Sequence, residues 1–569
     1  MEKRWVQNDI PNEAIRAKLE DSLHVSEALA ILLGQRGIMD FDLAKEFFRP
    51  TLDDLHDPFL MKDMDKAVER VQLAIEKGEK ILVYGDYDVD GTTAVSLFYS
   101  FLSSIHKACS YYIPDRNLEG YGISRQGIDY AADQGYSLMI SLDCGVKSVS
   151  LIQLAKDRGI DFIVCDHHNP GEILPPAVAV LDAKRKDCAY PYKELSGCGV
   201  GFKLAQAIAR TREMDESLLF QYLDLLAVSI ACDIVEIRGE NRILAYWGID
   251  KLNKNPCPGL KVLLEKAFEK RPKSNYDITD ILFYAGPRIN AAGRLEHAYG
   301  AVDLLLEQDE AKAAAFASKL HTTNDSRKEF EAEITKAAIA QCEADPDFSK
   351  QRATVAFGED WNKGVIGIVA SRLVEEYYRP TIVLTAIGDK VAGSARSVEG
   401  FDIHEAIDAC SEHLLQFGGH THAAGLTMDK EKVPAFKAAF EKQVAATIRP
   451  ECLVPELKYD MTLGLKSISE NFTKKMMQMA PFGPGNMNPL FVSRGVRDTG
   501  MSKTFGEHLS MNFYTADGIV GAMAFFQAKY YDAVKQGKLF DICYHIDWTE
   551  FNKKWRMQLR IIDMKPSET

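Results

Sequence analysis

The sequence predicts an α/β protein with a doubly wound parallel-sheet domain, a second and smaller α/β domain joined to it by a long helix, and a C-terminal β-barrel. Three observations support this fold class. From residue 80 onward, short apolar runs alternate with helical patterns, which is typical of βαβ units. A long charged helical pattern begins near residue 311, and short runs of alternating polarity fill the sequence after residue 453. The length of 569 residues exceeds that of one ordinary domain.

Composition indicates a folded cytoplasmic protein. Hydrophobic residues make up 46% of the chain and there are only 21 prolines, which argues against long disordered segments. The N-terminal stretch MEKRWVQNDIPNEA lacks the apolar core of a signal peptide, and no run approaches the ~18 apolar residues of a membrane span. We therefore expect neither export nor membrane insertion, and a cytoplasmic enzyme is the default.

The cysteines and the net charge narrow the possible classes of protein further. The eleven cysteines contain no CxxC pair, so they indicate reduced core residues and not a zinc or redox site. The net charge of −14 opposes nonspecific coating of nucleic acid. Aspartates that hold divalent cations would cancel part of this excess locally, so a nucleic-acid substrate in a local basic groove is not excluded.

We expect five parts along the chain. The first has amphipathic helical patterns without a chemical motif, which favours a packing cap. The parts are a helical segment (1–78), the parallel-sheet domain (79–300), a connecting helix (301–350), the smaller α/β domain (351–450) and the barrel (453–569).

The parallel-sheet domain carries three polar clusters, each at the end of an apolar strand. ILVYGDYDVDG places Asp86, Asp88 and Asp90 after the first strand; ISLDCG places Asp143 and IVCDHH places Asp166, His167 and His168 after later strands. One such aspartate is as often a helix N-cap as a functional residue. Parallel strands, however, bring their carboxyl ends to one edge of the sheet, where ligands bind. Three clusters together are poorly explained by capping.

Carboxylates this close would repel one another and raise their own pKa values unless cations neutralise them. Oxygen ligands with one or two imidazoles and no thiolate favour Mg²⁺ or Mn²⁺, and the histidine favours Mn²⁺. Two such ions about 3.5–4 Å apart activate water and stabilise charge on phosphoryl oxygens. The pattern therefore predicts two divalent cations and hydrolysis of a phosphate ester or phosphoanhydride.

These motifs resemble the DHH phosphoesterases, a family named for the triplet at 166–168. DYDVDG, SLDCG, CDHH and IACDIVEIRGENR correspond to the family's four patterns in order. The resemblance implies the metal ligands Asp88, Asp90, Asp143, His167 and Asp233. Asp86 is either a bridging ligand or a hydrogen-bond acceptor behind the ligands. His168 would face the scissile phosphate, and without the resemblance Asp233 would be taken for a helix-end cap.

Later motifs are similar to those of the single-strand-specific 5′-to-3′ exonucleases within this family. They are PRINAAGR (287–294), WNKGVIGIVASRL (361–373), GSARS (393–397) and FGGHTHAAG (417–425). This resemblance implies a DHH-associated second domain and a C-terminal barrel of the OB type. It also implies that Arg116, Ser394 and Arg396 bind the 5′ end of the strand and that Arg288 contacts the backbone near the cut.

Physical chemistry supports a phosphate site at these motifs. Arg288 and Arg294 flank an alanine-rich turn, and forked guanidinium donors suit phosphate recognition. Two glycines before His420 permit close backbone approach, so this histidine could donate to a phosphoryl oxygen. Surface salt bridges for the arginines and a loop or core position for His420 are the alternatives.

One position departs from the family. Trp361 is followed by Asn362 where the family commonly has histidine. Asparagine can donate and accept hydrogen bonds, but it cannot carry a proton at neutral pH. An acid-base role at this position is therefore not expected here.

The leading hypothesis is a single-stranded-DNA exonuclease, with PFGPGNMNPLF (481–491) and FNKKWR (551–556) as a further indication of nucleic-acid binding. The resemblance implies repair and recombination alongside a helicase and a single-strand-binding protein. A DHH phosphodiesterase for short oligoribonucleotides or cyclic dinucleotides is the alternative, and the residues after 453 count against it. A scaffold that has lost its metals is the third hypothesis, which the retained ligands oppose.

Overall fold

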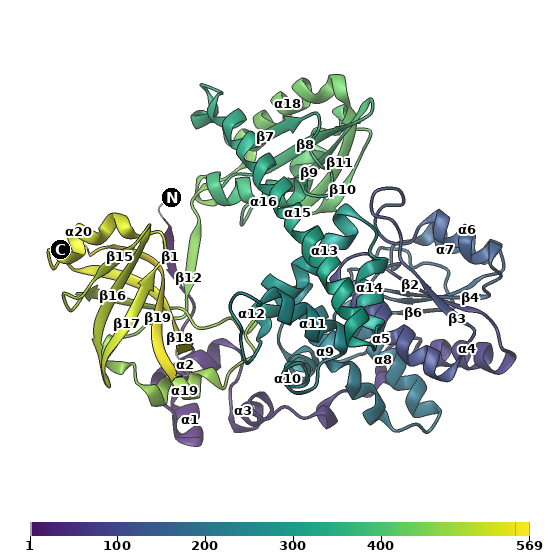
Figure 1. Ribbon diagram of the computed structural model, residues 1–569, viewed down its shortest axis with the longest axis horizontal. Coiled ribbons are helices and arrows are strands. Elements are labelled where there is room, and N and C mark those ends of the chain that lie inside the picture. Colours follow the sequence, from purple (N-terminus) through teal and green to yellow (C-terminus); the bar gives the residue numbers. More distant parts are fainter. Residues whose placement is uncertain (1–2, 552–553, 568–569) are drawn as a thin grey trace.

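The computed structural model describes residues 3–551 and 554–567, and the side chains of 3–548 and 555–567. Three lobes are visible in Figure 1: the parallel-sheet lobe at the right, the second α/β lobe at the top, and the C-terminal lobe at the left. Among the described residues, no helix is both long and apolar enough to cross a lipid bilayer.

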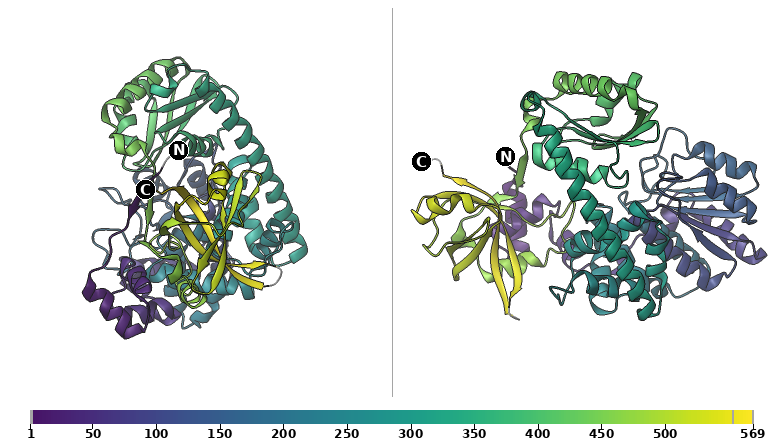
Figure 2. Two further views of the ribbon diagram at one scale, coloured as in Figure 1. Left: turned by 90° about the vertical axis from the view of Figure 1, so that its left-hand side faces the viewer. Right: turned by 45° about the horizontal axis from the view of Figure 1, so that its top comes forward.

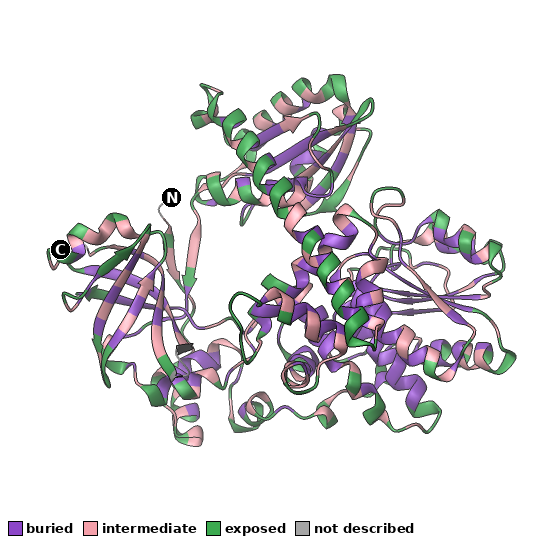
Figure 3. Ribbon diagram, in the orientation of Figure 1, coloured by how far each residue is buried: buried purple, intermediate pink, exposed green. Residues whose placement is uncertain are grey.

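The first lobe contains a five-stranded parallel sheet in the order β3-β2-β4-β5-β6. Leu82 and Tyr84 of β2 pack with α6 and α7 on one face, whereas Ile81 and Val83 pack with α5 and α8 on the other. Because both faces are covered, all of β2 and β4 is buried (Figure 3). The elements are β2 (Ile81–Gly85), α5 (Val89–Ile105), β3 (Cys109–Tyr112), α6 (Arg125–Asp133), β4 (Leu138–Leu142), α7 (Val149–Asp157), β5 (Asp161–Cys165), β6 (Ala179–Leu181) and α8 (Gly197–Thr211).

A helical region follows the sheet and ends in one long helix. The 34-residue α15 begins at the N-cap Asp309, whose side chain accepts from the backbone N–H of Lys312. Ala313 and Leu320 of α15 belong to the core of the first lobe, and Ile334 and Ala338 to a core of the second, so one long helix joins the two lobes (Figure 2). It is shorter than the predicted 301–350, because residues 301–306 belong to a separate helix. The helices are α9 (Leu223–Cys232), α10 (Gly239–Lys254), α11 (Pro258–Ala267), α12 (Ile278–Asp280), α13 (Gly286–Leu295), α14 (Tyr299–Leu306) and α15 (Glu310–Glu343).

The second lobe is a mixed sheet in the order β10-β11-β9-β8-β7, in which only β7 and β8 pair in parallel. Helix α16 packs on β8 and β9, and Phe436 and Phe440 of α18 are fully buried in the core. The elements are β7 (Thr354–Gly358), α16 (Ile366–Tyr377), β8 (Thr381–Ile387), β9 (Lys390–Arg396), α17 (Ile403–Asp408), β10 (Gln416–His420), β11 (Ala423–Asp429) and α18 (Val433–Thr447).

The C-terminal lobe is one seven-stranded sheet in the order β13-β14-β18-β19-β17-β16-β15. Within the described residues, no pairing joins the edge strands β13 and β15, so the strongly curved sheet is not closed by backbone hydrogen bonds. The elements are β12 (Glu456–Tyr459), β13 (Met461–Thr462), α19 (Glu470–Met477), β14 (Phe491–Val496), β15 (Lys503–Phe505), β16 (His508–Thr515), β17 (Gly518–Ala524), α20 (Tyr531–Lys535), β18 (Phe540–Phe551) and β19 (Lys554–Pro566).

The N-terminal segment is helical but does not pack as one unit. Leu19 and Leu32, from the first two helices, join the core of the C-terminal lobe, whereas Met64 and Val71 of α4 join the core of the first lobe. Strand β1 also pairs in parallel with β12. The elements are β1 (Arg4–Gln7), α1 (Glu13–Leu23), α2 (Glu27–Gln35), α3 (Phe41–Phe48) and α4 (Met64–Lys77).

Candidate metal centre and phosphate-binding cluster

The three polar clusters lie after neighbouring strands. Strands β2, β4 and β5 are adjacent, and they are followed by Asp86–Asp90, Asp143 and Asp166–His168 respectively. The end of α9 contributes Asp233 from the other side. The predicted convergence at the carboxyl edge of the sheet is therefore present.

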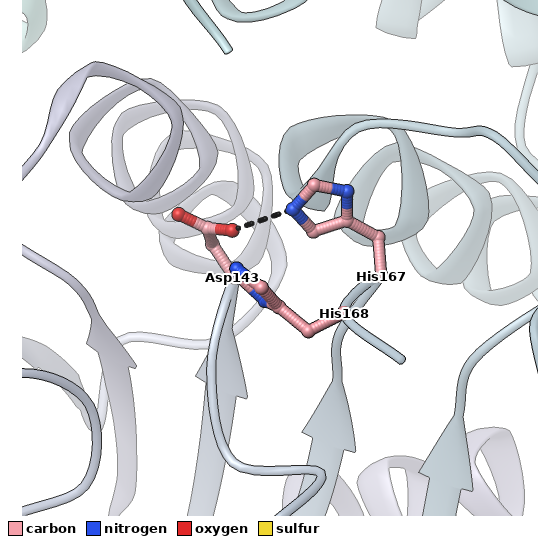
Figure 4. A group of neighbouring side chains, drawn as sticks. All are labelled: Asp143, His167 and His168. Carbon is pink, nitrogen blue, oxygen red and sulfur yellow. Dashed lines mark ion pairs between the residues drawn. The ribbon is translucent and has the colours of Figure 1, made fainter. Parts of the chain in front are cut away.

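His167 lies at the centre of this group. Its Nε2 is 3.1 Å from Oδ1 of Asp143, 3.5 Å from Oδ2 of Asp233 and 3.8 Å from Oδ2 of Asp90. In the part of the chain that the structure describes, two sets have ligand atoms within 4.8 Å of one another: Asp143 with His167 and His168, and Asp90 with His167 and Asp233. Figure 4 shows the first set, with Asp143 facing the ring of His167.

The chemistry of this group fits a divalent cation. Among the described residues, both carboxylate oxygens of Asp86, Oδ1 of Asp143 and both ring nitrogens of His167 are buried without a hydrogen-bond partner. Burial, and then repulsion by Asp90 and other carboxylates, raises the pKa of Asp143 well above its ordinary value and that of Asp233 to about 9. Burial also lowers the pKa of His167, which favours the neutral imidazole that binds metals. A cation would satisfy one ring nitrogen of His167 together with the carboxylates of Asp143, Asp90 and Asp233 around it.

Local structure fixes the position of each ligand. The side chain of Asp88 caps α5 by accepting from the backbone N–H of Gly91. Asp90 accepts from the backbone N–H groups of Gly197 and Cys198 and from the hydroxyl of Ser229. Asp143 has a left-handed backbone (φ 61°), which is costly for a residue with a side chain and typical of functional sites.

Gly197, at the start of α8, touches Asp143 closely. A Cβ at Gly197 would lie 2.6 Å from the Cβ of Asp143 and 2.7 Å from its Oδ1. Only glycine therefore allows the N-terminus of α8 to approach this carboxylate.

The first residue of the DHH triplet orients the third. Nδ1 of His168 lies 2.7 Å from Oδ1 of Asp166, and Val146 donates its backbone N–H to the other oxygen. Burial opposes the charged ring, but the hydrogen bond to Asp166 raises the pKa of His168 to about 9. Nε2 of His168 lies 3.1 Å from the hydroxyl of Tyr121. Sequence reasoning missed Tyr121, and only its place in the same loop as Arg116 hinted at it.

A cluster of guanidinium groups lies next to the acidic turn. Tyr87 stands between Asp86 and Asp88 in the sequence, and Cζ of Arg116 lies over its ring, 5.0 Å from the ring centre. Burial, and then the charges of Arg116, Arg327 and Arg396, lower the pKa of Arg294 to about 9. Arg294 donates to the carbonyl of Gly364, just before α16. Sequence reasoning also missed Arg327, which lies on α15 outside any recognised motif.

Ser394 and Arg396, at the end of β9, lie against the first turn of α16. Arg396 donates to the hydroxyl of Ser394 at 3.2 Å. A Cβ at Gly367, in the first turn of α16, would lie 2.9 Å from Oγ of Ser394 and 3.0 Å from Nη2 of Arg396. Both side chains therefore lie against the positive end of the helix dipole, which favours anions.

The other predicted residues lie at the edges of these clusters. Arg288 is buried, and it donates through Nε to Nδ1 of His321 and through Nη1 to the carbonyl of Tyr284. His420 is exposed on β10, in line with Arg396 because both pair with Ala423. No described side chain of the acidic group contacts His420. Asn362 accepts from the backbone N–H of Gly364 at 2.8 Å, so it shapes the turn before α16.

The structure describes only part of the two C-terminal motifs that suggested nucleic-acid binding, 481–491 and 551–556. Within 481–491, Phe482 packs against the core of the C-terminal lobe. Of FNKKWR, Trp555 is half exposed, whereas the side chains of 551–554 lie outside the described residues.

Comparison with known proteins identifies the family. Three family models match: the N-terminal domain of the DHH family over residues 80–230, the DHHA1 domain over 350–446 and the RecJ OB domain over 459–563. The single-stranded-DNA-specific exonuclease RecJ of Bacillus subtilis is 34% identical over 572 residues, covering 99% of this chain and 71% of that protein. The chain belongs to the RecJ family.

Other RecJ proteins match most of this chain as well. RecJ of Escherichia coli is 34% identical over 76% of this chain and 78% of its own. The crystal structure of RecJ with Mn²⁺ from Thermus thermophilus matches with a TM-score of 0.84 at 27% identity, over 100% of this chain and 80% of that one. A further RecJ structure bound to manganese is 32% identical with a TM-score of 0.61, over 70% of this chain. The predicted DHH, DHH-associated and OB-type regions are thereby confirmed.

Proposed function

We propose that this protein is a metal-dependent exonuclease that degrades single-stranded DNA from its 5′ end to 5′-mononucleotides in DNA repair and recombination. One observation carries the proposal. In a chain of the RecJ family, buried carboxylates and His167 converge beside a cluster of arginines. This arrangement suits a reaction in which an anionic backbone is cut next to bound cations.

Two divalent cations, Mn²⁺ or Mg²⁺, are the cofactors of the proposed reaction. Asp86, Asp88, Asp90, Asp143, His167 and Asp233 would hold them. Bound there, the ions would supply a nucleophilic water and neutralise charge on the phosphoryl oxygens. Asp90 should keep its position with or without metal, because two backbone N–H groups and the hydroxyl of Ser229 donate to it.

The arginine cluster accounts for recognition of the strand. Arg116, Arg294 and Arg396 have few acceptors of their own, so they can donate to a terminal 5′ phosphate, together with Ser394 and the start of α16. The strand would then run from this cluster to the metal centre. Arg288 and His420 would contact the backbone along this path.

His168 is suited to hold a proton near the scissile phosphate. Its pKa of about 9 keeps the ring protonated at neutral pH, and Asp166 fixes its orientation. The ring can therefore donate a hydrogen bond to a phosphoryl oxygen as negative charge develops on it.

The test uses purified protein with Mn²⁺ and DNA labelled at its 3′ end. We expect 5′-phosphorylated single strands to be shortened stepwise from the 5′ end, and blunt duplex to remain intact. Asp143→Ala should lose hydrolysis while retaining strand binding in a fluorescence anisotropy assay. An uncut single strand, or a variant as active as the native chain, would contradict the proposal.

The cellular setting is part of the same proposal. All eleven cysteines are free thiols, and most are buried, as expected in a reducing compartment such as the cytoplasm. A helicase and a single-strand-binding protein are the partners that the family resemblance suggests. Coprecipitation from a cell extract, with and without nuclease treatment, tests for them.

A further inference from the structure

A loop of the C-terminal lobe packs against the segment that carries the metal ligand Asp233. We call residues 479–487, between α19 and β14, the joint loop, and residues 233–238, between α9 and α10, the Asp233 segment. Ile237 donates its backbone N–H to the carbonyl of Pro484 at 2.7 Å, and Nε of Arg238 donates to the carbonyl of Gly485 at 2.9 Å. Arg238 and Gly485 are 247 positions apart in sequence.

Arg242, in the first turn of α10, holds the other end of the joint loop. Its guanidinium donates to the carbonyls of Met479, Ala480 and Pro481 at 3.0–3.4 Å, and to the carbonyl of Phe47. It also stacks on the ring of Phe47 at 3.7 Å. Among the described residues no carboxylate pairs with Arg242, so the backbone of the joint loop compensates this buried cation.

The contact leaves no spare room. Ile237 is fully buried, and a Cβ at Gly483 would lie only 2.6 Å from its Cγ1. Gly485 has a left-handed backbone (φ 73°), and a Cβ there would lie 3.0 Å from Nε of Arg238. Movement of the joint loop must therefore displace the Asp233 segment.

The joint loop is itself rigid. Gly483 and Asn486 exchange backbone hydrogen bonds, and Nδ2 of Asn486 donates to the carbonyls of Met479 and Pro481. Arg36 of the N-terminal segment donates to Oδ1 of Asn486. The loop thus transmits the position of the C-terminal lobe as one body.

The Asp233 segment, in contrast, has few contacts near the ligand itself. Asp233 is the C-cap of α9, and the next residue, Ile234, has a left-handed backbone (φ 59°) and a side chain that is 60% exposed. Beyond α9, the docked residues 237 and 238 are the next firm attachment to another lobe. Within the first lobe, the side chains of Asn241 and Tyr192 also donate to the carbonyl of Glu236. The position of the Asp233 carboxylate depends on α9, on these bonds and on the docked residues 237 and 238.

We infer that the joint loop is a positioning element for the metal centre: docking of the C-terminal lobe through Gly483, Pro484 and Gly485 sets the place of Asp233. The inference rests on the metal centre of the proposed function. It makes the affinity for metal, and not only for DNA, depend on a lobe that contributes no ligand. Groups that orient metal ligands commonly change affinity by about 10–100-fold when altered.

The experiment measures Mn²⁺ binding to the full chain by isothermal titration calorimetry, without DNA. Gly483→Ala should weaken Mn²⁺ binding by about tenfold, because the new methyl group pushes on Ile237. Gly464→Ala is the matched control, since a Cβ there meets no atom closer than 3.9 Å. It should bind Mn²⁺ as the native chain does.

A double variant separates positioning from general damage. The Cβ of Ile237 would lie 3.8 Å from the new methyl group, an ordinary contact, so Ile237→Ala combined with Gly483→Ala should recover most of the lost affinity. If Gly483→Ala instead weakened binding through a general loss of stability, the double variant should bind Mn²⁺ still more weakly, because it also loses buried side-chain volume. Arg238→Met provides a second variant in case Gly483→Ala does not fold. It changes an exposed side chain and removes only the hydrogen bond to Gly485, so it should weaken Mn²⁺ binding two- to threefold.

Hydrogen exchange gives a second readout that requires no activity. By reciprocity, bound Mn²⁺ should slow exchange of the backbone amides of Ile237 and Asn486. Native-like Mn²⁺ affinity in Gly483→Ala and Arg238→Met would overturn the inference while leaving the proposed function intact. A native chain that binds no Mn²⁺ would overturn the proposed function, and the inference with it.

Discussion

Replacing Asp233 by asparagine should change stability in opposite directions without and with metal. Burial and the neighbouring Asp90 and Asp88 raise the pKa of Asp233 to about 9 from an ordinary value of 3.8. The folded carboxyl therefore holds a proton that the unfolded one releases, and stability falls as the pH rises between these two values. The amide of the substituted side chain does not titrate, so it carries no such dependence. The variant should be the more stable protein in the absence of metal.

The size of the stability change follows from the pKa shift of Asp233. At about pH 8 the full difference corresponds to at most ~6 kcal/mol, at ~1.4 kcal/mol per pH unit. The carboxylate is 26% exposed, and contact with water reduces the penalty to an expected ~1–3 kcal/mol. This amounts to about 2–10 °C in the melting temperature of a domain of this size. At about pH 5 the difference should fall to about a third of its value at pH 8.

The assay is a thermal melt in a chelator at about pH 5 and about pH 8, repeated with Mn²⁺. A metal at ~100 times its dissociation constant stabilises the native chain by about 2.7 kcal/mol, which Asp233→Asn should largely lose. Asp63→Asn is the matched control. Burial opposes ionisation of Asp63, but Arg185 and Lys66 hold its pKa below the ordinary value, so this variant should be destabilised at about pH 8. If metal-free Asp233→Asn melts below the native chain at both pH values, burial and carboxylate repulsion do not destabilise the ionised Asp233.

Three further predictions concern substrate and catalysis. His168→Gln should lower kcat at least ~100-fold and remove the fall in activity expected above about pH 9, where the native ring loses its proton; a pH–rate profile checks this. Arg396→Lys keeps the charge but loses the forked guanidinium that donates to Ser394. The preference for a 5′ phosphate over a 5′ hydroxyl, measured as the ratio of the two KM values, should therefore drop about tenfold. A long single strand should be cleaved far faster than a dinucleotide, and the reverse order would favour the oligoribonucleotide or cyclic dinucleotide phosphodiesterase.

The fold of the first lobe could be predicted because its signals are local. Apolar runs such as ILVYG are buried on both faces, and the polar residues directly after them fall at the edge of the sheet by strand geometry alone. Asp90 and Asp143 therefore lie close to His167, as the strand order predicts. The outcome depends only on strand order and direction.

Asp233 shows where local signals end. It follows a helix, and as the C-cap of α9 it resembles an ordinary helix end. Only the packing of α9 against α5 brings its carboxylate within 3.5 Å of His167. No spacing within the sequence encodes that distance, so the family resemblance was needed to select it.

The joint loop shows a stronger form of the same difficulty. PFGPGN has the glycines and prolines of a turn, and the neighbouring aromatics suggested a nucleic-acid contact. In the structure the carbonyls of Met479, Ala480 and Pro481, at the start of the joint loop, accept from Arg242. Gly483 is required because Ile237 occupies the space of a side chain. Both partners lie in the first lobe. A glycine that permits approach by a distant segment has the same sequence signature as one that permits a turn, so only the three-dimensional contact distinguishes a connector that positions a metal ligand from one that merely reverses the chain.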